Sequence, residues 1–378
     1  MSRAAHTSAG AALLICGLLL FGPTASRGAV EDARPESRAG ISIVNGQPTT
    51  IAKWPWQVAL TVARRVSPAK PTSGRFFCGG SVLAPRLVVT AGHCVADLKP
   101  RQVRRLRIVS GRTRLNSRAG QVSRVVGRIM PRSPSGKLRY RTILGAADWD
   151  VALLRLAAPL SAEPIKIAGA DEAGAWAPGQ VAWTTGWGIT RGYSKRVSTK
   201  LRVARQVIMP DALCRRSEGV SFRASTMNCI GGPDGNSSTC SGDSGGPLVV
   251  RTSLGYRLVG LTSYGDSGCR GFLPSVDTRI AGGPLREWVA RVAGKLEGVD
   301  VVGAGGVAPP AREWCRVPET FGLTVPQARA KLAARGCRLG RVRVDRWGAG
   351  PSRRVIGYAR MPGWLAPLGA RINVWISP

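Results

Sequence analysis

The chain has 378 residues, enough for two or three domains, and carries a formal net charge of +34 from 55 basic and 21 acidic side chains. Its histidines are His6 and His93 alone, which excludes a histidine-rich metal site, and we expect neither a metal nor a cofactor. A positive field attracts anionic polymers, but no nucleic-acid-binding motif accompanies it; a GC-rich genome and export to a polyanionic wall explain the charge better than a specific nucleic-acid partner.

The N-terminal residues have the pattern of a secretory signal peptide. Arg3 precedes an apolar run from Ala9 to Phe21, and small residues follow. A membrane anchor needs about 20 apolar residues, and neither this run nor any later stretch is long enough, so we expect no membrane span. We assign residues 1–29 to a signal peptide and 30–42, which are polar and charged, to a disordered pro-segment. The mature protein is expected to be secreted and extracellular.

Residues 43–293 show short β-type segments separated by Gly and Pro, which predicts an antiparallel β-barrel architecture. The segments are residues 57–62, 86–90, 105–110, 151–156, 180–184, 247–251 and 257–262. A helix is expected over 284–292 near the end of this region. Its apolar residues recur at i, i+3, i+4 and i+7 and are Leu285, Trp288, Val289 and Val292.

Three motifs in this region supply the parts of nucleophilic catalysis. They are TAGHC around His93, DVALL starting at Asp150, and TCSGDSGGP around Ser244. A serine hydroxyl needs a base within hydrogen-bond reach, and that base needs a carboxylate to fix its tautomer and stabilise its cation. We therefore predict Ser244 as nucleophile, His93 as general base and acid, and Asp150 as the orienting carboxylate.

Over residues 43–293 the chain resembles the chymotrypsin-like (trypsin-fold) serine endopeptidases. The resemblance implies a mostly β fold, with a double antiparallel β-barrel and a C-terminal helix. It also implies hydrolysis of protein or peptide substrates through an acyl-enzyme, and an oxyanion hole formed by the N–H groups of Gly242 and Ser244. Ser263 matches the segment that pairs with the substrate backbone and is expected to support Asp150. Because no triad member is lost, we favour activity over the alternative, a catalytically silent protease-fold binding protein acting at the cell wall.

The predicted specificity pocket lacks the acidic floor of a tryptic enzyme. The residue six before the nucleophile is Ser238 rather than aspartate. Gly265 leaves one wall open, and Ser275 stands at a wall position commonly occupied by glycine. Asp277, where the family often has tyrosine, is a competing source of negative charge near the floor. We predict an uncharged apolar or aromatic P1 residue in preference to a basic one.

An activation switch is implied by the resemblance of the run IVNG, starting at Ile43, to the mature family N-terminus. Cleavage before Ile43 creates an ammonium group that would be buried, pair with Asp243 and order the oxyanion hole. The residue before the cut is Ser42, whereas family zymogens usually have arginine or lysine. Either a non-tryptic protease makes this cut, or Arg38 is cut first and trimming follows.

Eight cysteines follow Cys16 of the signal peptide, and an even number in an exported chain indicates disulfides rather than a metal site. Spacing alone leaves their connectivity open. The family resemblance implies three pairs and leaves a fourth for the C-terminal unit. The pairs are Cys78–Cys94, Cys214–Cys229, Cys240–Cys269 and Cys315–Cys337.

Residues 294–311 have a linker composition rich in Gly, Val, Ala and Pro, and residues 312–378 form a separate small unit. A capping box with proline in the first turn starts a helix at Thr324 that runs to about Arg335. Two alternating strands follow, one with Val342 and Val344, the other with Ile372, Val374 and Ile376.

This C-terminal unit resembles a single PASTA repeat, with an unrelated small α+β module as the alternative. The pairing of such a unit with the protease region suggests a bacterial protein of the actinobacterial type. Residues 312–378 carry 13 basic and 3 acidic side chains, a net charge of +10. We therefore expect them to bind peptidoglycan or anionic wall polymers and to keep a monomeric enzyme associated with the cell wall.

Overall fold

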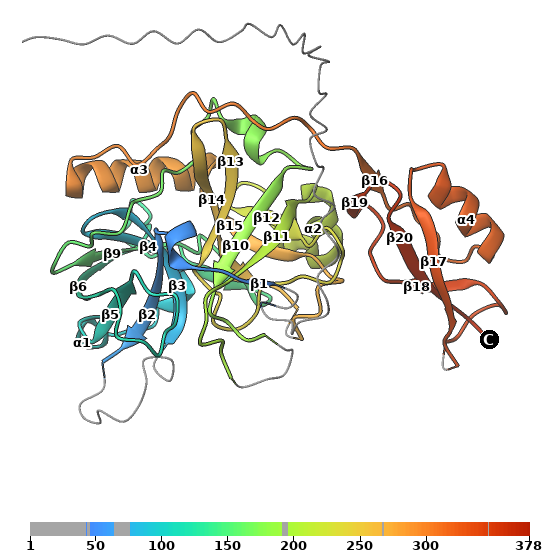
Figure 1. Cartoon of the computed structure of the whole chain (residues 1–378), viewed down its shortest axis with the longest axis horizontal. Coiled ribbons are helices and arrows are strands. Elements are labelled where there is room, and N and C mark those ends of the chain that lie inside the picture. Colours follow the sequence, from blue (N-terminus) through green and yellow to red (C-terminus); the bar gives the residue numbers. More distant parts are fainter. Residues whose placement is uncertain (1–42, 44–45, 64–75, 191–195, 267, 347) are drawn as a thin grey trace, which may run out of the picture. The chain divides into compact units, whose positions relative to one another are not determined.

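The computed structural model describes residues 43, 46–63, 76–190, 196–266, 268–346 and 348–378 (Figure 1). The signal peptide and the pro-segment expected at residues 1–42 lie outside the described residues. Where the chain is described, no helix is long and apolar enough to cross a membrane.

Strands between residues 57 and 156 form a first closed antiparallel barrel, in the order β2-β3-β4-β9-β6-β5 (Figure 1). Its strands are β2 (Gln57–Val62), β3 (Phe76–Ala84), β4 (Leu87–Thr90), β5 (Leu106–Ser110), β6 (Gln121–Ile129) and β9 (Ala152–Leu156). Successive residues of a strand point to opposite faces. In β9, Ala152, Leu154 and Leu156 therefore fill the barrel interior, while Leu153 belongs to a core shared with the second barrel described next.

Strands between residues 181 and 279 form a second antiparallel barrel, in the order β10-β13-β14-β15-β12. β11 closes this barrel because it pairs with both β10 and β12. The strands are β10 (Val181–Gly186), β11 (Arg202–Ile208), β12 (Met227–Gly231), β13 (Pro247–Thr252), β14 (Gly255–Tyr264) and β15 (Ser275–Arg279), and β1 (Gln47–Pro48) pairs with the outer side of β11. The expected double β-barrel is confirmed.

Shorter elements connect these strands. They are the hairpin β7 (Arg141–Ile143) and β8 (Ala146–Asp148), helices α1 (Pro100–Val103) and α2 (Asp211–Glu218), and 3₁₀ turns at Ile51–Lys53, Gly92–Cys94, Ala173–Trp176 and Gly219–Ser221. The three disulfides implied by the resemblance are formed, and so is the fourth expected pair, Cys315–Cys337.

The helix expected over 284–292 is α3 (Gly283–Glu297), and Gly298 ends it in the left-handed conformation. Leu285, Trp288, Val289 and Ala293 are buried in the core shared by the two barrels.

The stretch expected as a linker, 294–311, starts within α3 and continues along the barrel surface. Val301 is buried, and its carbonyl accepts a hydrogen bond from the Ile167 N–H, whose own carbonyl accepts one from the Gly303 N–H.

The C-terminal unit is built from β16 (Trp314–Arg316), α4 (Val325–Ala333), β17 (Arg338–Val344), β18 (Val355–Tyr358), β19 (Leu365–Pro367) and β20 (Arg371–Ile376). The capping box at Thr324 is present, and Ala328 and Leu332 are the buried residues of α4. The two expected strands are β17 and β20, which pair in parallel; β18 adds an antiparallel partner to β20. β16, β18 and β19 were not predicted.

Candidate active site

The histidine and the aspartate are brought together by the register of two neighbouring strands. β4 and β9 pair so that Thr90 lies opposite Ala152. His93 follows Thr90 in the 3₁₀ turn Gly92–Cys94, which the Cys78–Cys94 disulfide fixes, and Asp150 lies just before β9. The His93 Nδ1 is 2.8 Å from the Asp150 Oδ2, and the His93 backbone N–H donates to Oδ1 at 2.7 Å.

Asp150 is buried, and polar groups from the second barrel surround it. The Ser263 hydroxyl donates to its Oδ2 at 2.6 Å, and the Thr278 hydroxyl donates to its backbone carbonyl at 2.8 Å. Burial of the His93 imidazole lowers its pKa, whereas the hydrogen bond and charge of Asp150 raise it, and the net pKa lies above the ordinary value. The arrangement fixes one tautomer of His93 and stabilises its protonated form.

A buried carboxylate that sequence reasoning missed holds the chain just before Asp150. Asp148 accepts hydrogen bonds from the Trp149 N–H at 2.9 Å and the Thr226 hydroxyl at 2.7 Å, and forms ion pairs with Arg141 and Arg223. Trp149 has a positive φ of 53°, an uncommon conformation for a bulky residue. The Asp148 contacts hold the turn from which Asp150 projects.

Ser244 lies in a tight turn between the two barrels. Its carbonyl accepts a hydrogen bond from the Gly79 N–H at 2.7 Å, and the Gly245 N–H donates to the Thr262 carbonyl at 2.7 Å. Gly245 has φ +74°, and a Cβ there would collide with the Thr90 hydroxyl, so no side chain fits. The turn that holds Ser244 thus packs against the end of β4, three residues before His93.

Asp243, which precedes the predicted nucleophile Ser244, is fully buried. Its Oδ1 accepts from the Gly188 N–H at 2.8 Å, and its Oδ2 accepts from the Cys240 N–H at 3.0 Å. Burial raises the pKa of this carboxyl to about 7, although the two hydrogen bonds lower it. The expected partner residue, Ile43, is also fully buried.

A cavity of about 190 Å³ opens beside Ser244. It is lined by residues 239–241 and Ser244 on one side and by residues 262–266 and Cys269 on the other. The Cys240–Cys269 disulfide joins these two sides. Of the predicted pocket residues, Ser263 and Gly265 line this cavity, whereas Ser238, Ser275 and Asp277 do not.

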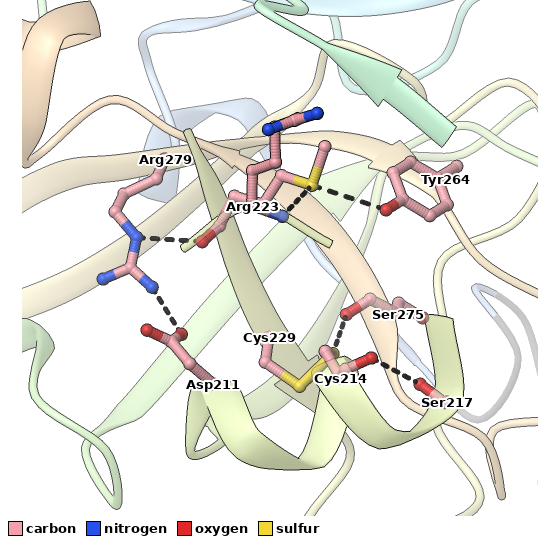
Figure 2. Close-up of a disulfide and its surroundings, with 9 residues drawn as sticks. Asp211, Cys214, Ser217, Arg223, Cys229, Tyr264, Ser275 and Arg279 are labelled. Atoms are coloured by element: carbon pink, nitrogen blue, oxygen red, sulfur yellow. Dashed lines mark hydrogen bonds and ion pairs between the residues drawn. A yellow bond between two sulfur atoms is a disulfide. The ribbon is translucent and has the colours of Figure 1, made fainter. Parts of the chain in front are cut away.

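Ser238 and Ser275 lie together near this cavity. Their hydroxyl oxygens are 3.4 Å apart, and both residues are buried. A Cβ on Gly265 would be 3.1 Å from the Ser275 hydroxyl, so these predicted wall residues are in contact. Figure 2 shows the Cys214–Cys229 disulfide beside Ser275, with the Arg279–Asp211 ion pair next to it.

Asp277 is a buried carboxyl behind this region. Burial raises its pKa to about 7; a backbone hydrogen bond from Ser263 lowers the pKa, and the charge of Asp243 raises it. Its Oδ1 has no hydrogen-bond partner among the described residues. An unpartnered oxygen in a buried site is costly when ionised, so Asp277 is a weaker counter-charge than an aspartate fully ionised at neutral pH.

Cys78, His93 and Cys94 are close enough together to suggest a metal site, but their chemistry does not fit one. Both sulfurs belong to the Cys78–Cys94 disulfide and therefore offer no thiolate ligand.

Comparison with known proteins gives one family match and a similar curated relative. The family model named Trypsin matches residues 43–289, from the expected mature N-terminus into α3. A protein called Trypsin from Saccharopolyspora erythraea is 36% identical over 239 residues, which cover 63% of this chain and 93% of the relative. The matched family span contains His93, Asp150 and Ser244 and ends before the C-terminal unit.

Proposed function

Because the chain belongs to the trypsin family of serine proteases, we propose that it is a secreted endopeptidase that hydrolyses peptide bonds through His93, Asp150 and Ser244. The observation that carries the proposal is the 2.8 Å contact between the His93 Nδ1 and the buried Asp150 carboxylate, beside the cavity that Ser244 lines. A histidine oriented in this way can act as a general base on a neighbouring hydroxyl.

The proposed reaction has two stages. The Ser244 Oγ attacks the scissile carbonyl carbon while His93 takes the hydroxyl proton, and the N–H groups of Gly242 and Ser244 stabilise the oxyanion. Gly242 has a φ of +97°, a backbone conformation that glycine adopts readily and that other residues rarely adopt. His93 then gives the proton to the leaving amine, which leaves an acyl-enzyme. Water then attacks the ester carbonyl carbon while His93 takes one of its protons. The bond between this carbon and the Ser244 Oγ breaks, His93 returns the proton to Oγ, and the carboxylic acid product leaves.

The proposed P1 preference is for uncharged apolar or aromatic side chains. Ser238 and Ser275 present hydroxyls rather than a carboxylate, and a P1 arginine or lysine would be buried without a counter-charge there. The competing possibility is that the ionised Asp277 supplies this charge. At a pKa of about 7, it is only partly ionised at neutral pH.

A peptide library varied at P1 tests both the activity and this preference. With the chain cleaved before Ile43, we expect kcat/KM for Phe, Tyr, Leu and Met to exceed that for Arg and Lys, because no ionised carboxylate stands at Ser238. The Asp277→Asn variant should keep this order. Asp97→Asn, which makes the same change at an exposed site, serves as the control. A preference for arginine that disappears in Asp277→Asn would reverse the P1 assignment, and no cleavage of any peptide would refute the endopeptidase proposal.

We also propose that the protein is exported and held at the cell wall through residues 312–378. Four disulfides support an oxidising destination. The exposed arginines Arg338, Arg341 and Arg343 lie along β17, where they give the C-terminal unit a basic edge. Anionic wall polymers are the chemistry that such an edge would attract.

Binding of the full-length Ser244→Ala protein to purified wall sacculi tests this proposal. We expect the bound fraction to fall as salt rises and when the anionic polymers are stripped, because exposed charges are screened over about 8–10 Å at physiological ionic strength. Replacing Arg338, Arg341 and Arg343 by glutamine should weaken binding. The matched control replaces Arg101, Arg104 and Arg105, three exposed arginines in and just after α1, by glutamine. Binding that survives salt and stripping would indicate muropeptide recognition, and equal loss in both triple variants would contradict a role for β17.

A further inference from the structure

The C-terminal unit shares a hydrophobic core with the second barrel. One cluster of buried residues joins β11, α2, β12 and β15 to the C-terminal unit, and Trp364 is its largest fully buried side chain. The Trp364 Nε1–H donates to the Gly232 carbonyl at 3.3 Å. A Cβ on Gly231, the last residue of β12, would be 2.6 Å from the Trp364 ring. The indole therefore packs directly on the backbone that leaves β12.

Arg360 contacts the same stretch of chain at Asp234 and Gly235, just after the residues that Trp364 contacts. Its guanidinium donates to the Asp234 carbonyl, and a Cβ on Gly235 would be 2.6 Å from its Nε. The segment is closed on itself as well, because the Asp234 Oδ1 accepts hydrogen bonds from the Asn236 N–H, the Ser237 N–H and the Ser237 hydroxyl. Residues 231–237 thus form a compact turn whose outer side rests on the C-terminal unit.

This turn, which we call the 231–237 segment, leads directly into the specificity pocket. Its next residue is Ser238, whose hydroxyl faces that of Ser275. The loop after Cys269 also rests on it, because a Cβ on Gly271 would be 2.5 Å from the Asn236 backbone. Since Cys240–Cys269 joins the pocket's two sides, a shift of the 231–237 segment would move the region of Ser238 and the loop together.

We propose that Trp364 and Arg360 are positioning residues for the specificity pocket, which they shape by holding the 231–237 segment. The proposal rests on the proposed endopeptidase function. It assigns a part in substrate selection, exerted through the 231–237 segment, to residues beyond the matched Trypsin family span, which ends at residue 289. Small displacements of groups that position a substrate lower rates strongly, by up to about 10²-fold for 1 Å.

The test compares full-length, processed variants on peptides with P1 Phe and P1 Ala. For Arg360→Ala and Trp364→Ala we expect kcat/KM for the Phe peptide to fall roughly 10- to 100-fold, mainly through KM, with a much smaller change for the Ala peptide. Arg360→Lys, which keeps a donor, and Trp364→Phe, which keeps an aromatic ring, should recover part of the loss. Phe321→Ala, an exposed position on the same unit, is the control.

Titration with a fluorophosphonate counts the intact active sites in each preparation. The proposal predicts a full complement of labelled sites in Arg360→Ala, with altered P1 discrimination. Unchanged discrimination in Arg360→Ala, or an equal loss on both peptides in proportion to lost labelling, would overturn it. If Trp364→Ala does not fold, Arg360→Ala decides the outcome alone. A wild-type enzyme that neither labels nor cleaves would instead refute the proposed function on which the inference rests.

Discussion

Replacing Ser244 by alanine is expected to lower kcat for peptide hydrolysis by about 10⁶-fold, because the nucleophile and its base act as a unit in serine proteases. The contacts that shape the turn are made by the backbone, through the Ser244 carbonyl and the Gly245 N–H. The variant should therefore fold with an unchanged melting temperature. We also expect Ser244→Ala to lose fluorophosphonate labelling. Turnover is measured by steady-state hydrolysis of the best peptide, and labelling by mass spectrometry of the treated protein.

A neighbouring serine provides the matched control for this variant. Ser241 lines the same cavity but is exposed, and its backbone carbonyl accepts from the Ile189 N–H. Ser241→Ala should keep both labelling and turnover to within a few fold. If the folded protein that starts at Ile43 neither labels nor cleaves, the alternative of a silent protease-fold binding protein at the cell wall would replace the enzyme. Labelling that persists in Ser244→Ala would show that a residue other than Ser244 is the nucleophile.

The strands that sequence reasoning recovered are those with an unbroken β-type pattern, such as β2 and β9. β3 was missed because Gly79 and Gly80 have the composition of a turn. In the structure they lie inside the strand, where a Cβ on Gly80 would be 2.9 Å from the Val89 carbonyl. Close packing of β3 on β4 requires the glycine there, and this requirement becomes visible only when both strands are placed.

The residues of the candidate site could be proposed from the sequence where they lie in local motifs. His93, Asp150 and Ser244 each sit in a motif, but the groups that hold them come from distant positions. Asp148 has no motif of its own, and its partner Thr226 lies 78 residues away in sequence. The contact between Trp364 and the Gly232 carbonyl spans 132 residues. Such pairs carry no periodicity or spacing signal, so the sequence gives no means of predicting them.

A chain that retains its pro-segment is expected to be nearly inactive, and so is a processed Asp243→Asn variant. Asp243 is fully buried, and burial raises its pKa to about 7. A freed Ile43 ammonium would supply the missing cation, and breaking such a buried pair costs about 3–5 kcal/mol. This corresponds to a loss of roughly 10²- to 10⁴-fold in kcat/KM if the pair orders the oxyanion hole. N-terminal sequencing of each preparation fixes which chain is being measured, and Asp97→Asn, at an exposed site, is the control.

The same pair predicts a pH effect on stability that separates the two forms. In the unprocessed chain the folded-state pKa of Asp243, about 7, lies above its unfolded value of 3.8. The folded state therefore binds more protons between these values, and its free energy of unfolding should fall as pH rises from about 4 to 7. Pairing with the Ile43 ammonium lowers the folded-state pKa and removes this loss. Thermal unfolding at pH 5 and pH 8 should show a smaller decrease for the processed Ser244→Ala protein than for unprocessed Ser244→Ala, and Asp243→Asn should abolish the difference. Full activity in a chain sequenced as unprocessed, or identical pH dependence of the two forms, would remove the Ile43–Asp243 pair from the mechanism.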